Sequence, residues 1–186
     1  MKTAAIIIAR LKSKRLPRKN LLDLCGKPLF CWNLEKALKI FPQTYFSSDS
    51  EEMQREAEAR GAIVIKRPEE LAGDNVPNMP VFEHAYKYMD NPDLVVSLQS
   101  NSPTLPEDLI KRALKIMEIP KINELITIDK NLHVHGSIWA LRKERLLNYG
   151  DPFKYKAEIF LSDDSVDVHT IEDFKQAEEI LQIRKS

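Results

Sequence analysis

The chain has 186 residues, 43% of them hydrophobic, which is enough for one domain with a sizeable core. Its 28 basic and 28 acidic side chains cancel, so the net charge gives no indication of nucleic acid as a partner. No apolar stretch approaches the length needed to cross a membrane, and the N-terminal run passes straight into charges, unlike a signal peptide.

Cys25 and Cys31 are the only cysteines. Their spacing, with no second pair downstream, fits neither a zinc site nor a disulfide framework. We therefore expect two reduced thiols in a cytoplasmic protein.

A short apolar run near the N-terminus, Ala4–Ala9, is rich in β-branched residues and predicts a buried strand of a parallel sheet. Six cations follow within ten residues: Arg10, Lys12, Lys14, Arg15, Arg18 and Lys19. Ser13, Pro17 and Asn20 favour a turn over a continuing helix. A basic loop at the end of such a strand predicts an anion site, with phosphate as the common ligand. A solvated surface loop is the alternative.

Strands and helices are predicted to alternate through the first two thirds of the chain. The further strands cover residues 44–48, 62–66 and 94–98, and the helices cover 28–40, 51–60, 81–89 and 106–117. We expect residues 75–80 to be irregular and Thr104 to begin the helix 106–117. This order predicts an α/β fold, a doubly wound and mostly parallel sheet with right-handed crossovers. The loops at Arg10, Asp49, Arg67 and Gln99 would then converge at one sheet edge.

The last third is less regular. Strands are expected at 124–129, 137–142, 155–161 and 165–170, the second of them antiparallel, and helices at 143–149 and 172–184. The closing helix would turn five apolar residues inward: Phe174, Ala177, Ile180, Leu181 and Ile183. Because no repeat, low-complexity segment or linker interrupts the chain, we expect a single domain over residues 1–186.

Asp167 and His169 are two residues apart on a predicted strand, so both side chains would lie on one face. Carboxylates suit Mg²⁺, which takes one or two of them together with substrate phosphates, whereas histidine suits softer divalent ions. A helix cap is the alternative role for Asp167, although Thr170 is better placed for it.

Two further histidines, His133 and His135, also share a face. With no third ligand nearby, a surface or substrate-contact role is favoured over a metal site. His84 lies on a predicted helix face, where we interpret it as structural.

Two polar loops follow later strands. The loop of Arg67 and Asp74 could close over a ligand, or it could be an ordinary proline-initiated turn with an arginine–carboxylate pair. The segment Gln99–Ser102 carries short polar groups suited to a hydroxyl-rich ligand such as a sugar, or simply to a turn. The Walker A pattern GxxxxGK[ST] is absent, which argues against a P-loop ATPase.

Taken together, these loops resemble the signatures of the acylneuraminate cytidylyltransferases, also called CMP-sialic acid synthetases, with the CMP-Kdo synthetases as a more distant branch. The matching segments are Ala9–Asn20, Phe46–Asp49, Arg67–Asp74, Leu98–Pro103, His135–Trp139 and Ser165–Asp173. The resemblance implies a three-layer, Rossmann-like nucleotidyltransferase fold. It also implies attack by the anomeric hydroxyl of an acidic 2-keto sugar, a sialic acid-like nonulosonate, on the α-phosphorus of CTP, with Mg²⁺ as cofactor.

The resemblance assigns roles residue by residue. Arg10 and Lys19 would be catalytic. The nucleotide would be held by Arg10, Ser13, Lys14, Lys19, Asn20, Arg67 and Asp74. The sugar would meet Gln99, Asn101, Ser102 and His135, and the metal would meet Asp167 and His169.

Several departures from the family pattern leave alternatives open. His169 stands where relatives carry a second metal-binding aspartate, and His135 replaces an asparagine. The region between Met117 and His135 is short where relatives carry a dimerisation segment, so a homodimer stays an open option. The alternatives are a nucleotidyltransferase that uses another nucleotide or sugar, such as GTP or Kdo, and a nucleotide- or sugar-binding homologue without catalysis.

Overall fold

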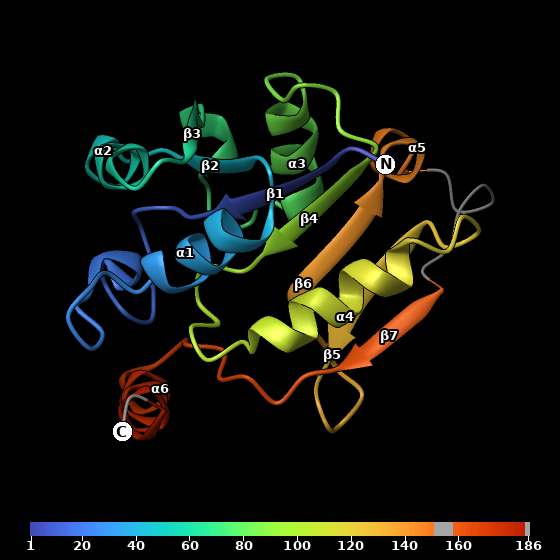
Figure 1. The fold of residues 1–186 in the computed structure, drawn as a ribbon. Coiled ribbons are helices and arrows are strands. Elements are labelled where there is room, and N and C mark those ends of the chain that lie inside the picture. The colour runs from blue at the N-terminus through green and yellow to red at the C-terminus, as the bar shows by residue number, and fades with distance from the viewer. Residues whose placement is uncertain (151–157, 185–186) are drawn as a thin grey trace.

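A seven-stranded sheet forms the centre of this computed structural model, which describes residues 1–150 and 158–184 (Figure 1). The strands are β1 (Thr3–Ile8), β2 (Thr44–Ser48), β3 (Ile63–Lys66), β4 (Leu94–Leu98), β5 (Glu124–Ile128), β6 (Val134–Arg142) and β7 (Ile159–Ser162). Their order in the sheet is β3-β2-β1-β4-β6-β5-β7. Only β6 runs antiparallel to its neighbours β4 and β5, and the remaining pairs are parallel. The expected α/β fold with a mostly parallel, partly mixed sheet is confirmed.

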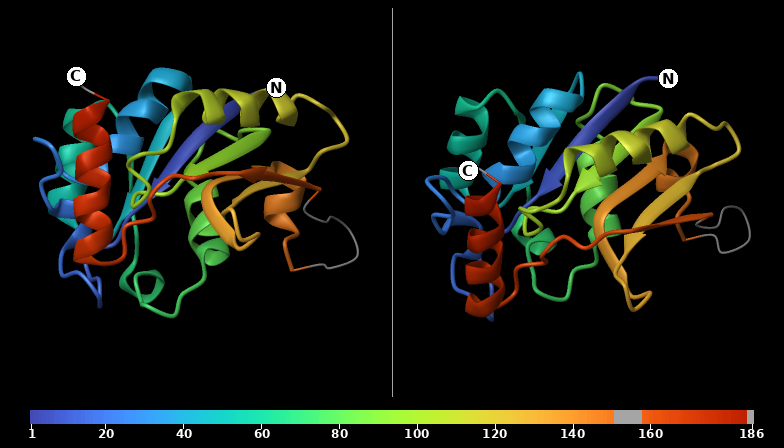
Figure 2. Two further views of the ribbon diagram at one scale, coloured as in Figure 1. Left: turned by 90° about the horizontal axis from the view of Figure 1, so that it is seen from below. Right: turned by 60° about the horizontal axis from the view of Figure 1, so that its bottom comes forward.

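Helices cover both faces of the sheet. They are α1 (Cys31–Ile40), α2 (Glu51–Ala59), α3 (Asn78–Tyr86), α4 (Glu107–Met117), α5 (Lys143–Leu147) and α6 (Ile171–Ile183), with 3₁₀ turns η1 (Lys19–Leu21) and η2 (Glu69–Leu71). Alternate residues of β1 point to opposite faces. Ala5 and Ile7 pack in a core with α1, α2 and α4, whereas Ala4 and Ile6 pack in a second core with α3 and α5. The sheet therefore lies between two helical layers (Figure 2).

The closing helix α6, drawn in red, packs away from the sheet and beside the segment that leads into α1 (Figure 2). Phe174, Ala177 and Leu181 form a third core with Leu24 and Leu29, which precede α1. Thr170 caps the helix in a reciprocal capping box with Asp173. This packing brings the segment before α6 to the loop that follows β1.

Most predicted elements are present, with shifted ends in several places. The helix predicted over 28–40 begins at Cys31, after a turn in which the Cys31 amide donates to the carbonyl of Pro28. Asn78–Pro80, expected to be irregular, forms the start of α3, because a proline in the first helical turn forfeits no intrahelical bond. Ile183, expected to face inward, is 73% exposed.

Two further expectations are corrected in the last part of the fold. Thr104 does not cap α4; its hydroxyl accepts a hydrogen bond from the Val166 amide at 2.8 Å. Residues 165–170 do not form the expected strand; the amide of Val168 donates instead to the carbonyl of Asn101 at 2.8 Å. The strand expected over 155–161 lies partly outside the described residues, and its described part begins β7 at Ile159.

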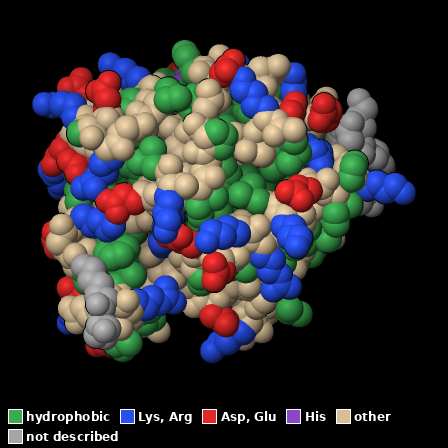
Figure 3. All heavy atoms as spheres, viewed as in Figure 1, with side chains coloured by type: hydrophobic (Ala, Val, Ile, Leu, Met, Phe, Trp, Pro, Cys, Tyr) green, Lys and Arg blue, Asp and Glu red, His purple; other side chains and the backbone are tan. Residues whose placement is uncertain are grey.

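Charged side chains of both signs are interspersed on the face seen in Figure 3. None of the helices in residues 1–150 and 158–184 is both long and apolar enough to cross a membrane.

Candidate active site

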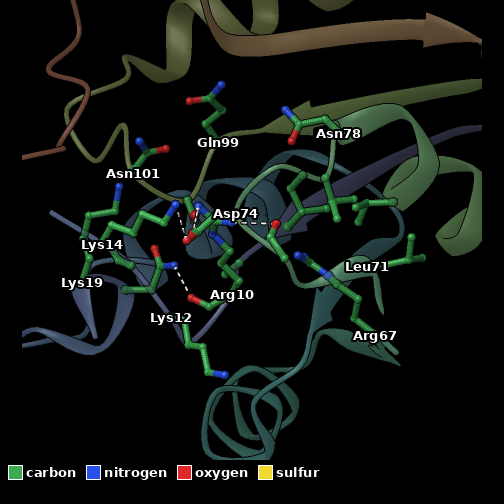
Figure 4. A pocket seen from close by; sticks show the side chains of 18 of the residues that line it. Arg10, Lys12, Lys14, Lys19, Arg67, Leu71, Asp74, Asn78, Gln99 and Asn101 are labelled. Carbon is green, nitrogen blue, oxygen red and sulfur yellow. Dashed lines mark hydrogen bonds and ion pairs between the residues drawn. The ribbon is translucent and has the colours of Figure 1, made fainter. Parts of the chain in front are cut away.

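A pocket of about 420 Å³ lies at the carboxyl ends of β1 and β4. It is lined by the loop after β1, by residues between β3 and α3, by the Gln99–Asn101 turn and by His169 (Figure 4). The side chains that reach it include Arg10, Ser13, Lys14, Lys19, Asn20, Arg67, Asp74, Gln99 and Asn101, all predicted from the sequence. The expected convergence is therefore confirmed for the loops at Arg10, Arg67 and Gln99, whereas Asp49 contacts the backbone of the first loop without lining the pocket.

The basic loop is held to the sheet by two polar side chains. The Asn20 amide nitrogen donates to the carbonyl of Arg10 at 3.0 Å, and Asp49 accepts from the Leu11 amide at 2.9 Å. The Asn20 Oδ1 atom is buried and has no partner among the described groups. A loop fixed in this way can keep several cations in place before any ligand arrives.

Asp74 partly neutralises the basic loop across the pocket. One of its oxygens lies 2.9 Å from the Arg10 guanidinium and the other lies 3.1 Å from the Lys14 ammonium (Figure 4). Arg10 also donates to the carbonyl of Gly73 at 2.8 Å. One carboxylate thus sits between two cations that the sequence assigns to an anionic ligand.

Arg67 is only 6% exposed. Its guanidinium donates to the carbonyl of Ser47 at 2.6 Å and to the Ser47 hydroxyl at 3.3 Å. Burial lowers the pKa of Arg67 to about 10, although the nearby Asp49 carboxylate opposes this shift. Asp74, in the same loop, forms its ion pairs with Arg10 and Lys14.

Lys19 connects the basic loop to the segment before α6. Its ammonium donates to the carbonyl of Val168 at 2.6 Å. Burial lowers the pKa of Lys19 to about 8; the cations Arg15 and Arg10 lower it further, while Asp167 acts in the opposite direction. Lys19 is thus a cation kept in place but poorly solvated, and an added anion would stabilise its charged form.

His169 lines the pocket and is in contact with Asp167, which itself does not line it. His169 Nε2 is 2.7 Å from Asp167 Oδ2, and His169 Nδ1 is 2.6 Å from the guanidinium of Arg15. The Asn101 amide donates to the other oxygen of Asp167. The shared face predicted for Asp167 and His169 is confirmed, although the segment is not a strand.

Asp167 and His169 differ in how well they suit Mg²⁺. No group of three or more His, Cys, Asp or Glu side chains is arranged for a metal within the described ranges. The Asp167 carboxylate offers the hard oxygen donors that Mg²⁺ prefers beside phosphate oxygens. Both ring nitrogens of His169 already have protein partners, so His169 fits the ion poorly.

The other residues predicted for the sugar separate into two groups. Gln99 and Asn101 reach the pocket, but Ser102 is fully buried and its carbonyl accepts from Asn33 at 2.9 Å. His135 does not line the pocket; its ring lies 3.3 Å from Asp163, and its carbonyl accepts from the Gln99 amide at 3.3 Å.

His133 does not share a site with His135. It is exposed and lies 3.4 Å from Asp129. His84 lies on α3 with its ring 5.1 Å from that of Tyr88. Neither histidine lines the pocket.

Sequence reasoning missed two buried polar residues, Asn33 and Asp163, that bind groups around the pocket-lining segments. Asn33, on the buried face of α1, donates to the carbonyls of Gln99 and Ser102 at 2.6 and 2.9 Å. Asp163 accepts from Ser137 and Ser165; burial alone would raise its pKa, but bonds from His135 and these serines lower it to about 2. A polar residue inside the apolar face of the helix 28–40 was the one available signal for Asn33.

A family model described as "Cytidylyltransferase" matches residues 4–139, well over half of the chain. The chain belongs to the cytidylyltransferase family. The match covers the basic loop and the turns after β3 and β4, and it ends before the segment that carries Asp167 and His169. The resemblance inferred from the sequence is thereby confirmed at the level of the family.

Curated relatives agree with this assignment. The chain is 37% identical over 120 residues to the pseudaminic acid cytidylyltransferase of Campylobacter jejuni subsp. jejuni serotype O:2, which covers 61% of this chain and 52% of the relative. It is 36% identical over 119 residues to the N-acylneuraminate cytidylyltransferase of Escherichia coli O18:K1:H7, covering 63% and 28%. This cytidylyltransferase-family chain therefore spans about half, or less, of the length of these relatives.

A solved structure of CMP:2-keto-3-deoxy-manno-octonic acid synthetase, complexed with CTP, has the same fold with a TM-score of 0.82. The superposition covers 99% of this chain and all of the other at 16% identity. The likeness supports the nucleotidyltransferase fold of this family member.

Proposed function

We propose that the chain transfers a cytidylyl group from CTP to an acidic 2-keto sugar of the nonulosonate class. The anomeric oxygen forms a bond to the α-phosphorus, the bond between the α-phosphorus and its bridging oxygen to the β-phosphate breaks, and pyrophosphate leaves. The proton of the anomeric hydroxyl passes to solvent. The observation that carries the proposal is the pocket lined by Arg10, Lys14 and Lys19 together with His169, which pairs with Asp167.

Positive charge is the main contribution that these side chains make. Negative charge builds up on the phosphoryl oxygens and on the leaving pyrophosphate during nucleotidyl transfer, and fixed cations stabilise it. Arg10 and Lys19, which are held by Gly73 and Val168, act on these oxygens, while Ser13, Lys14 and Asn20 hold the remaining phosphates. Mg²⁺, held by Asp167 and phosphate oxygens, would add further neutralisation of charge.

The sugar is assigned to the side of the pocket formed by the turn after β4. Gln99 and Asn101 present amide groups there that can bind hydroxyl and carboxylate oxygens. Arg67 lies on the opposite side, near the loop that carries Asp74, where we assign it to the nucleotide. The names of the relatives support pseudaminic, sialic or 3-deoxy-manno-octulosonic acid as the sugars to test.

The test is a pyrophosphate-release assay with CTP, Mg²⁺ and each of these three acids. We expect release with at least one acid, and none when Lys19→Ala or Arg10→Ala replaces the wild type. A parallel series with GTP, ATP and UTP checks the nucleotide by the shift of the thermal unfolding midpoint. If CTP shifts this midpoint but no acid supports release beside a competent control enzyme, the protein is a binding homologue and the proposed activity is wrong.

A further inference from the structure

Arg15 and His169 join two remote parts of the chain at the rim of the pocket. The guanidinium of Arg15 lies 2.6 Å from His169 Nδ1, across a separation of 154 residues. Both residues line the pocket. Neither the basic character of the loop nor the spacing of Asp167 and His169 indicates this contact.

The direction of the hydrogen bonds follows from the partners. A guanidinium only donates, so Nδ1 of His169 accepts from Arg15, and the ring proton must sit on Nε2. Nε2 then donates to Asp167, which at its other oxygen accepts from Asn101. The imidazole is thereby fixed at both nitrogens, and each group has a partner of the correct kind.

The contact with His169 restrains the side chain of Arg15 at the rim of the pocket. Arg15 is exposed and has a long side chain, which would otherwise sample many rotamers in solvent. It also lies close enough to Lys19 for its charge to lower the pKa of that lysine. A guanidinium held at this point adds a preorganised, bidentate donor to the cations of the pocket.

We propose that His169 is a positioning residue that holds Arg15 at the pocket rim for the phosphates of the nucleotide, and that it does not bind a metal ion. The proposal rests on the proposed function only in requiring that the pocket accept a triphosphate. It assigns to Arg15 a phosphate-binding role beside Arg10, Lys14 and Lys19. It also accounts for an imidazole in a place where an Mg²⁺ ligand would be an oxygen.

A double-mutant cycle tests the coupling. Binding of inorganic tripolyphosphate is measured by titration calorimetry for the wild type, Arg15→Ala, His169→Ala and the double variant. We expect each single change to weaken binding about threefold to tenfold, as for a lost charge-assisted contact near solvent. The double variant should bind no more weakly than Arg15→Ala, because both changes remove one interaction. Additive losses, or a single change without effect, would overturn the proposal.

Matched controls keep the cycle interpretable. Arg18→Ala removes a cation of the same loop that pairs with Glu52 at 2.5 Å and does not line the pocket. His133→Ala removes an exposed histidine elsewhere. Both should bind tripolyphosphate as the wild type does, and all variants should keep the thermal unfolding midpoint of the wild type. His169→Asn should restore binding, because its amide oxygen can take the place of Nδ1 as the acceptor for Arg15.

A metal readout separates positioning from ligation. Mn²⁺ binding in the presence of CTP is followed by electron paramagnetic resonance. Because His169 also donates to the Asp167 carboxylate, affinity alone does not separate the two roles. Pulsed spectra of the wild type should show no imidazole nitrogen coupled to Mn²⁺, whereas a coupling that disappears in His169→Ala would show that His169 ligates the ion. Coupling between Arg15 and His169 without any sugar turnover would refute the proposed activity alone. A wild type that fails to bind tripolyphosphate would refute this inference as well.

Discussion

Lys19 donates a hydrogen bond from its ammonium to the backbone carbonyl of Val168, which lies 149 residues further along the chain, at 2.6 Å. The same side chain lines the pocket between the loop after β1 and the segment before α6. A single cation therefore joins the two parts of the site that come from opposite ends of the domain.

Removal of this cation should impair binding directly. We expect Lys19→Ala to weaken CTP binding at least about tenfold, because a poorly solvated charge is lost beside the phosphates. Lys19→Arg should recover part of the affinity, since it keeps the charge. Calorimetric titration measures both, with Lys39→Ala, a change at an exposed lysine paired with Glu107, as the control. Unchanged CTP binding by Lys19→Ala would show that Lys19 does not help to hold the phosphates of the nucleotide.

The lowered pKa of Lys19 predicts proton uptake on binding. The free protein has a Lys19 pKa of about 8, so at pH 9 most Lys19 side chains are neutral. A bound triphosphate raises the pKa by favouring the ammonium, so binding at pH 9 should take up close to one proton, while binding at pH 7 should take up far less. Calorimetry in two buffers of different ionisation enthalpy measures this number. Lys19→Arg should abolish the uptake; an equal uptake in that variant would assign the proton to another group.

Removing the charge of Asp74 should increase the affinity of the pocket for phosphate groups. Its carboxylate occupies Arg10 and Lys14, so an incoming phosphate has to compete with it. We expect Asp74→Asn to bind tripolyphosphate about threefold to tenfold more tightly, the range expected for two partly exposed ion pairs. Asp23→Asn, which alters a turn contact to Gly26, serves as the control. Weaker binding by Asp74→Asn would instead support a direct contact between Asp74 and the nucleotide.

Substitution of Asn33 should change the stability of the fold rather than the binding of a ligand. Its fully buried amide donates to the carbonyls of Gln99 and Ser102 and accepts from the Lys36 ammonium at 3.0 Å. Asn33→Ala removes three buried hydrogen bonds, although each of the other groups keeps one further partner, and should lower the free energy of unfolding by about 2–4 kcal/mol. Urea denaturation measures the loss. Asn148→Ala, which removes an exposed amide, should stay within about 0.5 kcal/mol of the wild type.

The part of the site contributed by the parallel strands could be predicted from the sequence. Arg10, Lys19 and Gln99 follow predicted strands, and the carboxyl ends of parallel strands meet at one edge. β2 and β4 have the predicted bounds because each is a short, almost wholly buried run between turn residues. For these strands, the hydrophobic pattern of the sequence and the strand order of the sheet indicate the same elements.

The supporting contacts could not be predicted, because they depend on side chains that meet only in the folded chain. Ser102 was assigned to the sugar, but Asn33 holds its carbonyl and buries it. Residues 165–170 have the alternation of a strand, yet Thr104 and Asn101 take the hydrogen bonds that a neighbouring strand would have made. The pairing of His169 with Arg15 depends on the packing of α6 against residues that precede α1.

The packing of α6 beside the N-terminal region has a consequence for the order of events during synthesis. Arg10, Lys14 and Lys19 leave the ribosome early, whereas Val168 follows Lys19 by 149 residues. At ordinary translation rates of about 5–20 residues per second, the nascent chain carries this cluster of cations for several seconds before its C-terminal wall exists. The central strands can pair in that interval, but the contact of Lys19 with Val168 and the place of His169 in the pocket lining arise only when the segment before the last helix docks. The first half of the chain can therefore fold before the pocket has its complete lining.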